Sequence, residues 1–197
     1  RIVAFIEERF GIVVPPEGYL KAASELCRER NVLFIADEIQ TGLGRTGKIL
    51  ACEHEDVHPD GVTLGKALGG GILPVSMFLA KREVMSVFRP GDHGSTFGGN
   101  PLAAAVGLEA LNILVEEELP QRSAAMGAYL MEQLKNIDSP LIREVRGRGL
   151  FIGVEIDRDH EAHRLGRIQV VVSLAVDDEG RRDDLTGPQL DPGGAFG

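Results

Sequence analysis

The chain has 197 residues, of which 43% are hydrophobic, and carries a formal net charge of −9. This length suits one domain with a sizeable core, or one domain with part of another. The negative charge disfavours a nucleic-acid or anionic-membrane partner, because binding to phosphates requires clustered lysine and arginine. We therefore expect a site for a small molecule.

The first elements expected along the chain are a strand, a helix and a second strand. Residues 1–6 form a short strand-like run, too brief for a signal peptide or a membrane-spanning helix. Apolar residues at helical spacing predict a helix over 18–30, just after Pro15 and Pro16. The continuous apolar run 32–36 then predicts a strand covered on both faces, as in parallel α/β sheets.

The middle of the chain alternates short strands, glycine-dense turns and helices. Strands are expected at 61–64 and 75–80, with turns at 69–71 and 93–100. Pro101 marks the start of a helix that reaches the acidic residues 116–118, and a further helix covers about 121–135. The predicted fold class is therefore α/β, with a mostly parallel sheet flanked by helices.

The last part of the chain changes character. Two strands, 142–145 and 150–156, are expected around a turn at 146–149 and would open a second, smaller domain. Residues 157–197 contain no lysine and little that could form a core, so we expect a poorly ordered tail. The expected units are a large domain over 1–120, the start of a small domain over 121–156 and the tail over 157–197.

Cysteine usage indicates a reducing compartment. Cys27 and Cys52 are too few for a disulfide framework, and no cysteine or histidine spacing suggests a metal site. We expect both thiols to be reduced in the cytoplasm.

Two adjacent acids, Asp37 and Glu38, end the apolar run. The carboxyl ends of parallel strands are where α/β proteins place ligands, and a carboxylate inside such a site needs a cationic partner. The alternative interpretation, favoured by the acid pair alone, is that one of them caps the next turn.

Lys66 also follows a predicted strand, between the small residues Gly65 and Ala67. A lysine held in such a place loses its proton more easily than a surface lysine and is a candidate Schiff-base nucleophile. It is not a P-loop lysine, because Ala67 stands where Ser or Thr is required. A solvated loop lysine is the alternative.

Ser95 and Thr96 precede a glycine-rich turn close to a helix start. Hydroxyls and backbone N–H groups in this setting form a chemically sensible phosphate cradle, although such clusters are also found in plain loops.

Four ordered motifs together resemble a known family. They are IADEIQTG at 35–42, GRTG at 44–47, LGKAL at 64–68 and HGSTFGGNP at 93–101. This series is similar to that of the class III pyridoxal-phosphate aminotransferases, which have fold type I, over about residues 11–156. Within that class the motifs are most similar to those of the ornithine aminotransferases.

The resemblance implies a role for each candidate residue. Asp37 would pair with the pyridinium nitrogen of pyridoxal phosphate, and Lys66 would bind the cofactor covalently and then move a proton. Gln40 would contact the phenolic oxygen side of the ring. Ser95 and Thr96 would bind the phosphate of a neighbouring subunit, so the active unit would be at least a homodimer. Glu38 would be structural, and Arg45 would fix a loop or an interface.

The chain departs from the family pattern at both ends. Residues 5–15 lack a family loop whose glutamate controls recognition of the substrate carboxylate, and neither Glu7 nor Glu8 takes its place. The arginines beyond residue 156 match no substrate-binding motif. We therefore expect a truncated or frameshifted C-terminal portion of the family fold, completed by a homodimer partner or by a complementing N-terminal chain.

The resemblance implies transfer of the δ-amino group of ornithine to 2-oxoglutarate, with amino-acid and 2-oxo-acid substrates. A non-catalytic remnant or interaction module of the same fold is the alternative function. A nucleotide-binding module is disfavoured, because the chain contains no Walker motif.

Overall fold

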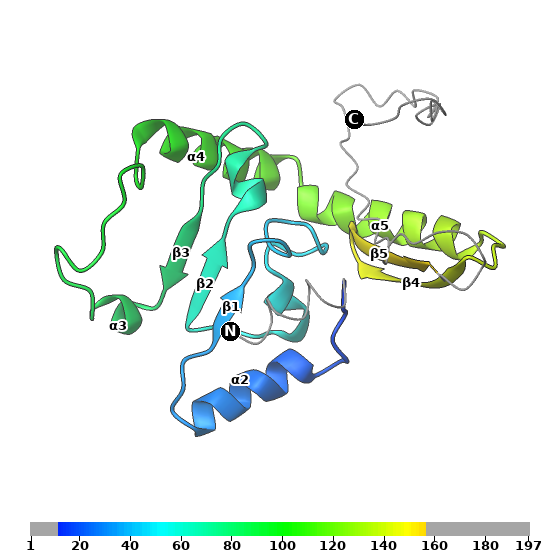
Figure 1. Ribbon diagram of the computed structural model, residues 1–197, viewed down its shortest axis with the longest axis horizontal. Helices are drawn as coiled ribbons and strands as arrows, with labels where there is room; N and C mark the ends of the chain where they lie inside the picture. Colours follow the sequence, from blue (N-terminus) through cyan, green and yellow to red (C-terminus); the bar gives the residue numbers. More distant parts are fainter. Residues whose placement is uncertain (1–11, 157–197) are drawn as a thin grey trace, which may run out of the picture.

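The computed structural model describes residues 12–156. The strand expected at 1–6 and the poorly ordered tail expected at 157–197 lie outside the described residues. In the part that is described, the chain forms two sheets and the helices that pack beside them (Figure 1).

The first sheet carries both acids and Lys66 at or just beyond its strand ends. Its strands are β1 (Ile35–Asp37), β2 (Gly61–Leu64) and β3 (Met77–Ala80), in the order β1-β2-β3. β1 and β2 are parallel, with Asp37 opposite Thr63, whereas β2 and β3 are antiparallel. The α/β class is confirmed, and the strand predicted at 61–64 is found with the same bounds.

Two helices flank this sheet. α2 (Tyr19–Glu29) precedes β1 and lies beside the short 3₁₀ helix η1 (Ala51–Glu55), and α4 (Pro101–Glu116) packs against the 3₁₀ helix η2 (Lys66–Gly69) (Figure 1). Gly107 of α4 faces η2, where a Cβ would be in ordinary van der Waals contact with the backbone oxygen of Leu68, at 3.7 Å. Both helices were expected at nearly these bounds, and they are confirmed.

The core of this part is small. Five buried apolar residues from β2, η2, α4 and the loop after β1 form one cluster: Leu43, Val62, Leu64, Leu68 and Leu114. Leu68 is 1% exposed and links η2 to α4. This cluster fixes the backbone that carries Lys66, two residues before Leu68.

The strand expected to be covered on both faces is not covered in the described residues. Ile35 in β1 is 48% exposed, and Val32 and Leu33 before it are also exposed. The prediction of two-sided burial was wrong here, because β1 is short and lies at an edge of the three-stranded sheet. A continuous apolar run indicates that both faces of a strand are suited to burial, but it does not identify the elements that cover them.

The second sheet is an antiparallel hairpin under a long helix. α5 (Leu119–Lys135) packs on β4 (Ile142–Arg148) and β5 (Phe151–Ile156). The turn was expected at 146–149, but β4 continues to Arg148, which pairs with Phe151. The sequence prediction was wrong at this point because the glycine at 147 suggested a turn, whereas it lies inside the ladder.

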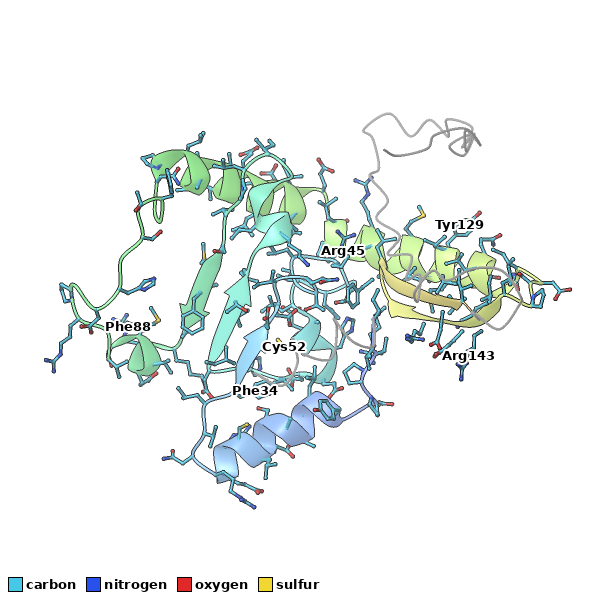
Figure 2. All side chains as sticks on the ribbon, viewed as in Figure 1. Phe34, Arg45, Cys52, Phe88, Tyr129 and Arg143 are labelled. Carbon is cyan, nitrogen blue, oxygen red and sulfur yellow. The ribbon has the colours of Figure 1, made fainter. Side chains whose placement is uncertain are left out.

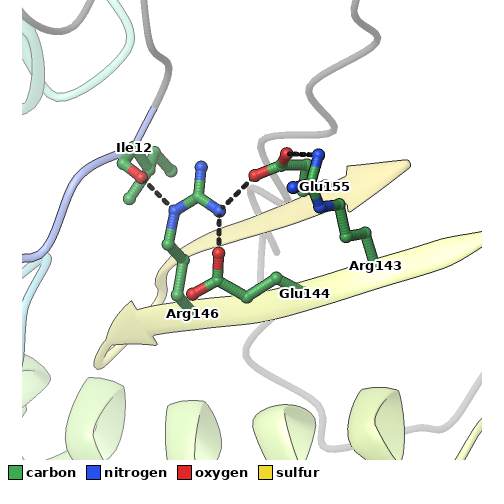
Figure 3. Close-up of polar contacts among 5 residues, drawn as sticks. All are labelled: Ile12, Arg143, Glu144, Arg146 and Glu155. Atoms are coloured by element: carbon green, nitrogen blue, oxygen red, sulfur yellow. Dashed lines mark hydrogen bonds and ion pairs between the residues drawn. The ribbon is translucent and has the colours of Figure 1, made fainter. Parts of the chain in front are cut away.

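Arg146 of β4 ties the hairpin to the segment before α2. Its Nη1 lies 2.6 Å from Glu144 Oε2 and 2.9 Å from Glu155 Oε2, and its Nε donates to the backbone oxygen of Ile12 at 2.5 Å (Figure 3). Hydrogen bonding to Glu155 is the main cause that raises the pKa of Arg146. Arg143 adds a longer ion pair to the other oxygen of Glu155.

The sequence did not predict the short elements η1, η2 and α3 (Arg82–Met85). Each has five residues or fewer, too short to show an apolar period. No helix among residues 12–156 is long and apolar enough to cross a membrane.

Candidate active site

Asp37 is the last residue of β1 and is exposed at the carboxyl end of the strand. Its Oδ1 accepts hydrogen bonds from Thr63 Oγ1 at 3.1 Å and from the backbone N–H of Ile39 at 3.2 Å. No hydrogen bond reaches Oδ2 from residues 12–156, and no side-chain cation there pairs with Asp37. One oxygen is therefore held in place and the other is free to bind a donor.

Glu38, the second acid, is buried. It is 3% exposed, and its Oε2 accepts from Thr41 Oγ1 at 2.5 Å while its Oε1 accepts from the backbone N–H of Cys52 at 2.9 Å. Adjacent residues at a strand end point to opposite sides, so one acid faces solvent and the other the interior. The alternative prediction was that one of the two acids caps the next turn. Both acids do so, because each accepts a hydrogen bond from a residue of the turn that follows.

Cys52 lies against this buried carboxylate. Burial raises the pKa of the Cys52 thiol to about 12, and the charge of Glu38 and a hydrogen bond to it act in the same direction. The thiol therefore stays protonated and unreactive near neutral pH. Cys52 and Cys27 are both free, as the sequence predicted.

Lys66 follows β2 and begins η2. Its backbone has φ +47°, the left-handed region that a side-chain-bearing residue seldom adopts. Its Nζ donates to Gln40 Oε1 at 2.7 Å, and the side chain is exposed. Non-glycine residues in this conformation are concentrated at functional sites, where the surrounding structure holds them.

The structure thus brings three of the five candidate residues to one edge of the sheet. Asp37 ends β1, Gln40 lies in the turn after it, and Lys66 follows the neighbouring parallel strand. The segments after β1 and β2 also touch through Ile39, whose Cγ2 lies 3.3 Å from the position that a Cβ of Gly65 would occupy.

Ser95 and Thr96 are not brought to this group within the described chain. They lie in the exposed loop between α3 and α4, beyond β3 (Figure 1). Ser95 Oγ accepts from the backbone N–H of Gly98 at 2.9 Å, and Asn100 caps α4 by accepting from Ala103 N at 2.9 Å. No hydrogen bond links Ser95 or Thr96 to Asp37, Gln40 or Lys66.

The loop behind the site joins the two sheets. Arg45 lies between the first sheet and α5 (Figure 2), and its backbone oxygen accepts from Ser123 Oγ at 2.9 Å and from Leu150 N at 3.0 Å. Next to it, Thr46 O lies 3.1 Å from Nε2 of His54, whose pKa is lowered, mainly by burial. Arg45 was predicted to fix a loop or an interface, and its backbone oxygen holds this loop through the hydrogen bonds from Ser123 and Leu150.

Sequence reasoning missed Thr63, Thr41 and the Cys52 backbone as supports of the two acids. Thr63 could have been found from the register, because it lies opposite Asp37 once β1 and β2 are paired in parallel. The contact from Glu38 to Cys52 spans 14 residues and leaves no periodic signal. No cluster of histidine, cysteine and carboxylate residues suited to a metal occurs among residues 12–156.

Comparison with known proteins gives one family match and several similar relatives. The family model of the class-III aminotransferases matches residues 2–180. The ornithine aminotransferase of Exiguobacterium sp. (strain AT1b) is 63% identical over 155 residues, which cover 79% of this chain and 39% of that protein. The ornithine aminotransferase of Bacillus subtilis is 60% identical over 151 residues, 77% of this chain and 38% of that protein. The chain thus spans about two fifths of the length of the curated relatives it matches.

Solved structures with the same arrangement include two aminotransferases. The ornithine aminotransferase from Toxoplasma gondii matches with a TM-score of 0.71 and 53% identity, covering 73% of this chain and 35% of that one. The acetylornithine aminotransferase from Elizabethkingia anophelis matches with a TM-score of 0.74 and 50% identity, covering 77% and 38%. One Toxoplasma structure is described as having partial occupancy of PLP at its active site.

Proposed function

The chain belongs to the class-III aminotransferases, and from this premise we propose that it supplies the lysine and the aspartate of a pyridoxal-phosphate-dependent transaminase. The observation that carries the proposal is the hydrogen bond between Lys66 Nζ and Gln40 Oε1, beside the exposed carboxylate of Asp37. A cationic amine, an amide and a carboxylate meet at the carboxyl edge of the sheet, where α/β enzymes bind ligands.

The residues present fit pyridoxal phosphate. Asp37 keeps Oδ2 available for a ring N–H while Thr63 and Ile39 hold Oδ1. Lys66 lies between Gly65 and Ala67, whose small side chains leave room beside its amine for an aromatic ring. When bound, the cofactor supplies an electron sink for a carbanion formed on the amino substrate.

The chain's own groups would have separate tasks. Asp37 would hold a proton on the ring nitrogen by charge pairing. Lys66 would bind the cofactor through Nζ and, once the amino group of the substrate has displaced that nitrogen, would move a proton at the freed Nζ. Gln40 would orient the phenolic side of the ring. Ser95 and Thr96 would bind a phosphate from their exposed loop, and we assign that phosphate to the cofactor of a neighbouring subunit.

The substrates are proposed from the relatives. Two of the proteins most similar to this chain are named ornithine aminotransferases, so we propose ornithine as the donor of its δ-amino group and 2-oxoglutarate as the acceptor. We also propose a division into a partial large domain over 1–120 and the start of a small domain over 121–156, and the two separate sheets support it. We also propose the cytoplasm as the location, which fits the two free cysteines.

The partner is proposed from the coverage. The chain matches about 39% of its Exiguobacterium relative, and β1 is an edge strand with exposed apolar residues. A homodimer, or a complementing chain that carries the rest of the fold, would complete the site.

The test is amino transfer in the assembled protein. The chain is co-expressed with the portion of the Exiguobacterium relative outside the 155-residue match, and glutamate formation from ornithine and 2-oxoglutarate is measured with pyridoxal phosphate present. Activity that is lost in Lys66→Ala and kept in Lys48→Ala supports the proposal. An assembled, cofactor-bound complex that forms no glutamate would favour the non-catalytic alternative.

A further inference from the structure

Glu38 closes the turn that carries Gln40. Its Oε2 accepts from Thr41 Oγ1, three residues along the chain, and its backbone oxygen accepts from Gly42 N at 2.9 Å. Ile39 and Gln40 lie in the turn that these two hydrogen bonds close. The conformation of the turn therefore depends on a carboxylate that points away from the site.

The other oxygen of Glu38 anchors this turn to the interior. Oε1 accepts from the backbone N–H of Cys52, a residue that is 3% exposed at the start of η1. Gly42 permits the close fit, since a Cβ there would lie 2.7 Å from the Glu38 backbone oxygen. A carboxylate that is 3% exposed and accepts two hydrogen bonds has little freedom to move.

The outer side of the same turn contacts the lysine segment at two points. Gln40 accepts the hydrogen bond of Lys66 Nζ, and the Ile39 side chain lies against Gly65. The Lys66 backbone is in the left-handed region, and within residues 12–156 the hydrogen bond to Gln40 is the polar contact made by its amine. The direction of the amine therefore depends on the amide of Gln40.

We propose that Glu38 is a positioning residue for Lys66 and acts through Gln40: its two hydrogen bonds fix the turn whose amide aims the lysine amine along the sheet edge. This inference rests on the proposed function only in giving Lys66 its importance as the cofactor lysine. The coupling between Glu38, Gln40 and Lys66 is a property of the chain without cofactor, and it is tested there.

The test is competitive labelling of lysine amines in the full chain, read by mass spectrometry over a range of pH. Lys135, exposed at the end of α5, is the internal standard. Gln40→Ala removes the acceptor and should raise the labelling rate of Lys66 relative to Lys135 about fivefold, the factor expected for the loss of one ordinary hydrogen bond. Glu38→Ala should give a similar increase.

The double variant decides whether Glu38 acts through Gln40. If it does, Glu38→Ala should add nothing to the labelling of Lys66 once Gln40 is alanine. Glu38→Gln should restore near-normal labelling, because glutamine accepts from Cys52 N and donates to Thr41 Oγ1. A general loosening of the fold would not show this dependence on Gln40.

Thr41→Val serves if Glu38→Ala fails to fold, because it removes one partner of Glu38 and leaves the bond to Cys52. It should raise Lys66 labelling in the wild-type background and not in the Gln40→Ala background. Equal effects of Glu38→Ala, or of Thr41→Val in its place, in the two backgrounds would overturn the proposal, as would unchanged labelling in Gln40→Ala. If the assembled protein bound no pyridoxal phosphate while this coupling persisted, the proposed function would fail and the positioning role would stand.

Discussion

Lys66 Nζ and Gln40 Oε1 are 2.7 Å apart, although 26 residues separate them in the chain. The parallel pairing of β1 with β2 makes this contact, since both residues follow strand ends at the same edge of the sheet. The aspartate that ends β1 lies at the same edge, so one strand pair brings together the three residues of the proposed cofactor site.

Asp37→Asn is predicted to weaken cofactor binding without loss of the fold. Asparagine keeps an oxygen for Thr63 and Ile39 but loses the charge that would pair with a ring N–H. Hydrogen bonds to charged groups contribute about 1.5–3 kcal/mol, so the affinity for pyridoxal phosphate should fall about 10- to 100-fold. Titration by absorbance measures it.

The matched control for that variant is Asp56→Asn, an exposed acid at the end of η1. It should bind pyridoxal phosphate like the wild type. Equal affinity of Asp37→Asn and wild type would remove Asp37 from the site.

Asp60→Asn is predicted to destabilise the first sheet at neutral pH. Asp60 accepts from Lys81 Nζ at 2.7 Å and from the backbone N–H of Phe34 at 2.9 Å, and these two bonds, that to Lys81 first, lower its pKa below the ordinary 3.8. The free energy of unfolding should fall by about 1 kcal/mol at pH 7. Denaturant titration measures this change.

The sign of the pH dependence follows from the lowered pKa. The folded state favours the ionised carboxylate, so the stabilisation is complete above the unfolded pKa and is lost as pH falls through the lower folded value. The difference between wild type and Asp60→Asn should therefore shrink below about pH 4. A difference that grew with acidity would contradict this assignment.

Gly149→Ala is predicted to loosen the contact between the hairpin turn and the loop at 45–47. Gly149 has φ +54°, and a Cβ there would lie 2.5 Å from the Thr46 carbonyl carbon and 2.7 Å from Gly47 N. Backbone strain and the clash together should cost more than about 2 kcal/mol of unfolding free energy.

Gly71→Ala separates these two causes. Gly71 has φ +74° but nothing within 4 Å of its Cβ position, so this variant should lose only about 1 kcal/mol, from strain alone. Thermal unfolding of both proteins gives the comparison. Equal losses would show that Gly149 is required for its conformation and not for close packing.

Asn100→Ala is predicted to fray the start of α4 and to free the loop that holds Ser95 and Thr96. The Asn100 side chain accepts from Ala103 N and donates to Phe97 O, so it links the helix to the loop. Loss of an N-cap costs about 1 kcal/mol. Amide hydrogen exchange should increase over the first turn of α4, and Asn100→Asp, which keeps the acceptor, should leave that turn protected.

Much of the fold was predictable where the signal was local. Pro101 marked α4, and the short apolar run at 61–64 gave β2 its bounds. The sequence did not predict that Asp37 is exposed and Glu38 buried. Alternation along a strand places adjacent side chains on opposite sides, but it does not show which side faces the interior. The hairpin turn was misplaced because Gly147 lies within a ladder set by pairing partners rather than by its own preference.

The candidate site was predictable in its residues but not in its supports. The spacing of Asp37, Gln40 and Lys66 along two strand ends suffices to place them together once the strands pair in parallel. The contacts from Glu38 to Cys52 and from Arg45 to Ser123 join residues far apart in sequence, and they depend on the packed loop between the sheets. Such contacts appear only when the backbone path is known.

The most direct measurement of the central claim is to map the lysine that binds pyridoxal phosphate. The full chain, co-expressed with the portion of the Exiguobacterium relative outside the match, is mixed with the cofactor, reduced with borohydride, digested and analysed by mass spectrometry, with Lys66→Arg and Lys48→Arg in parallel. The account predicts one dominant adduct on Lys66, absent from Lys66→Arg and unchanged in Lys48→Arg. No adduct on Lys66, or equal labelling of the exposed lysines, would contradict it.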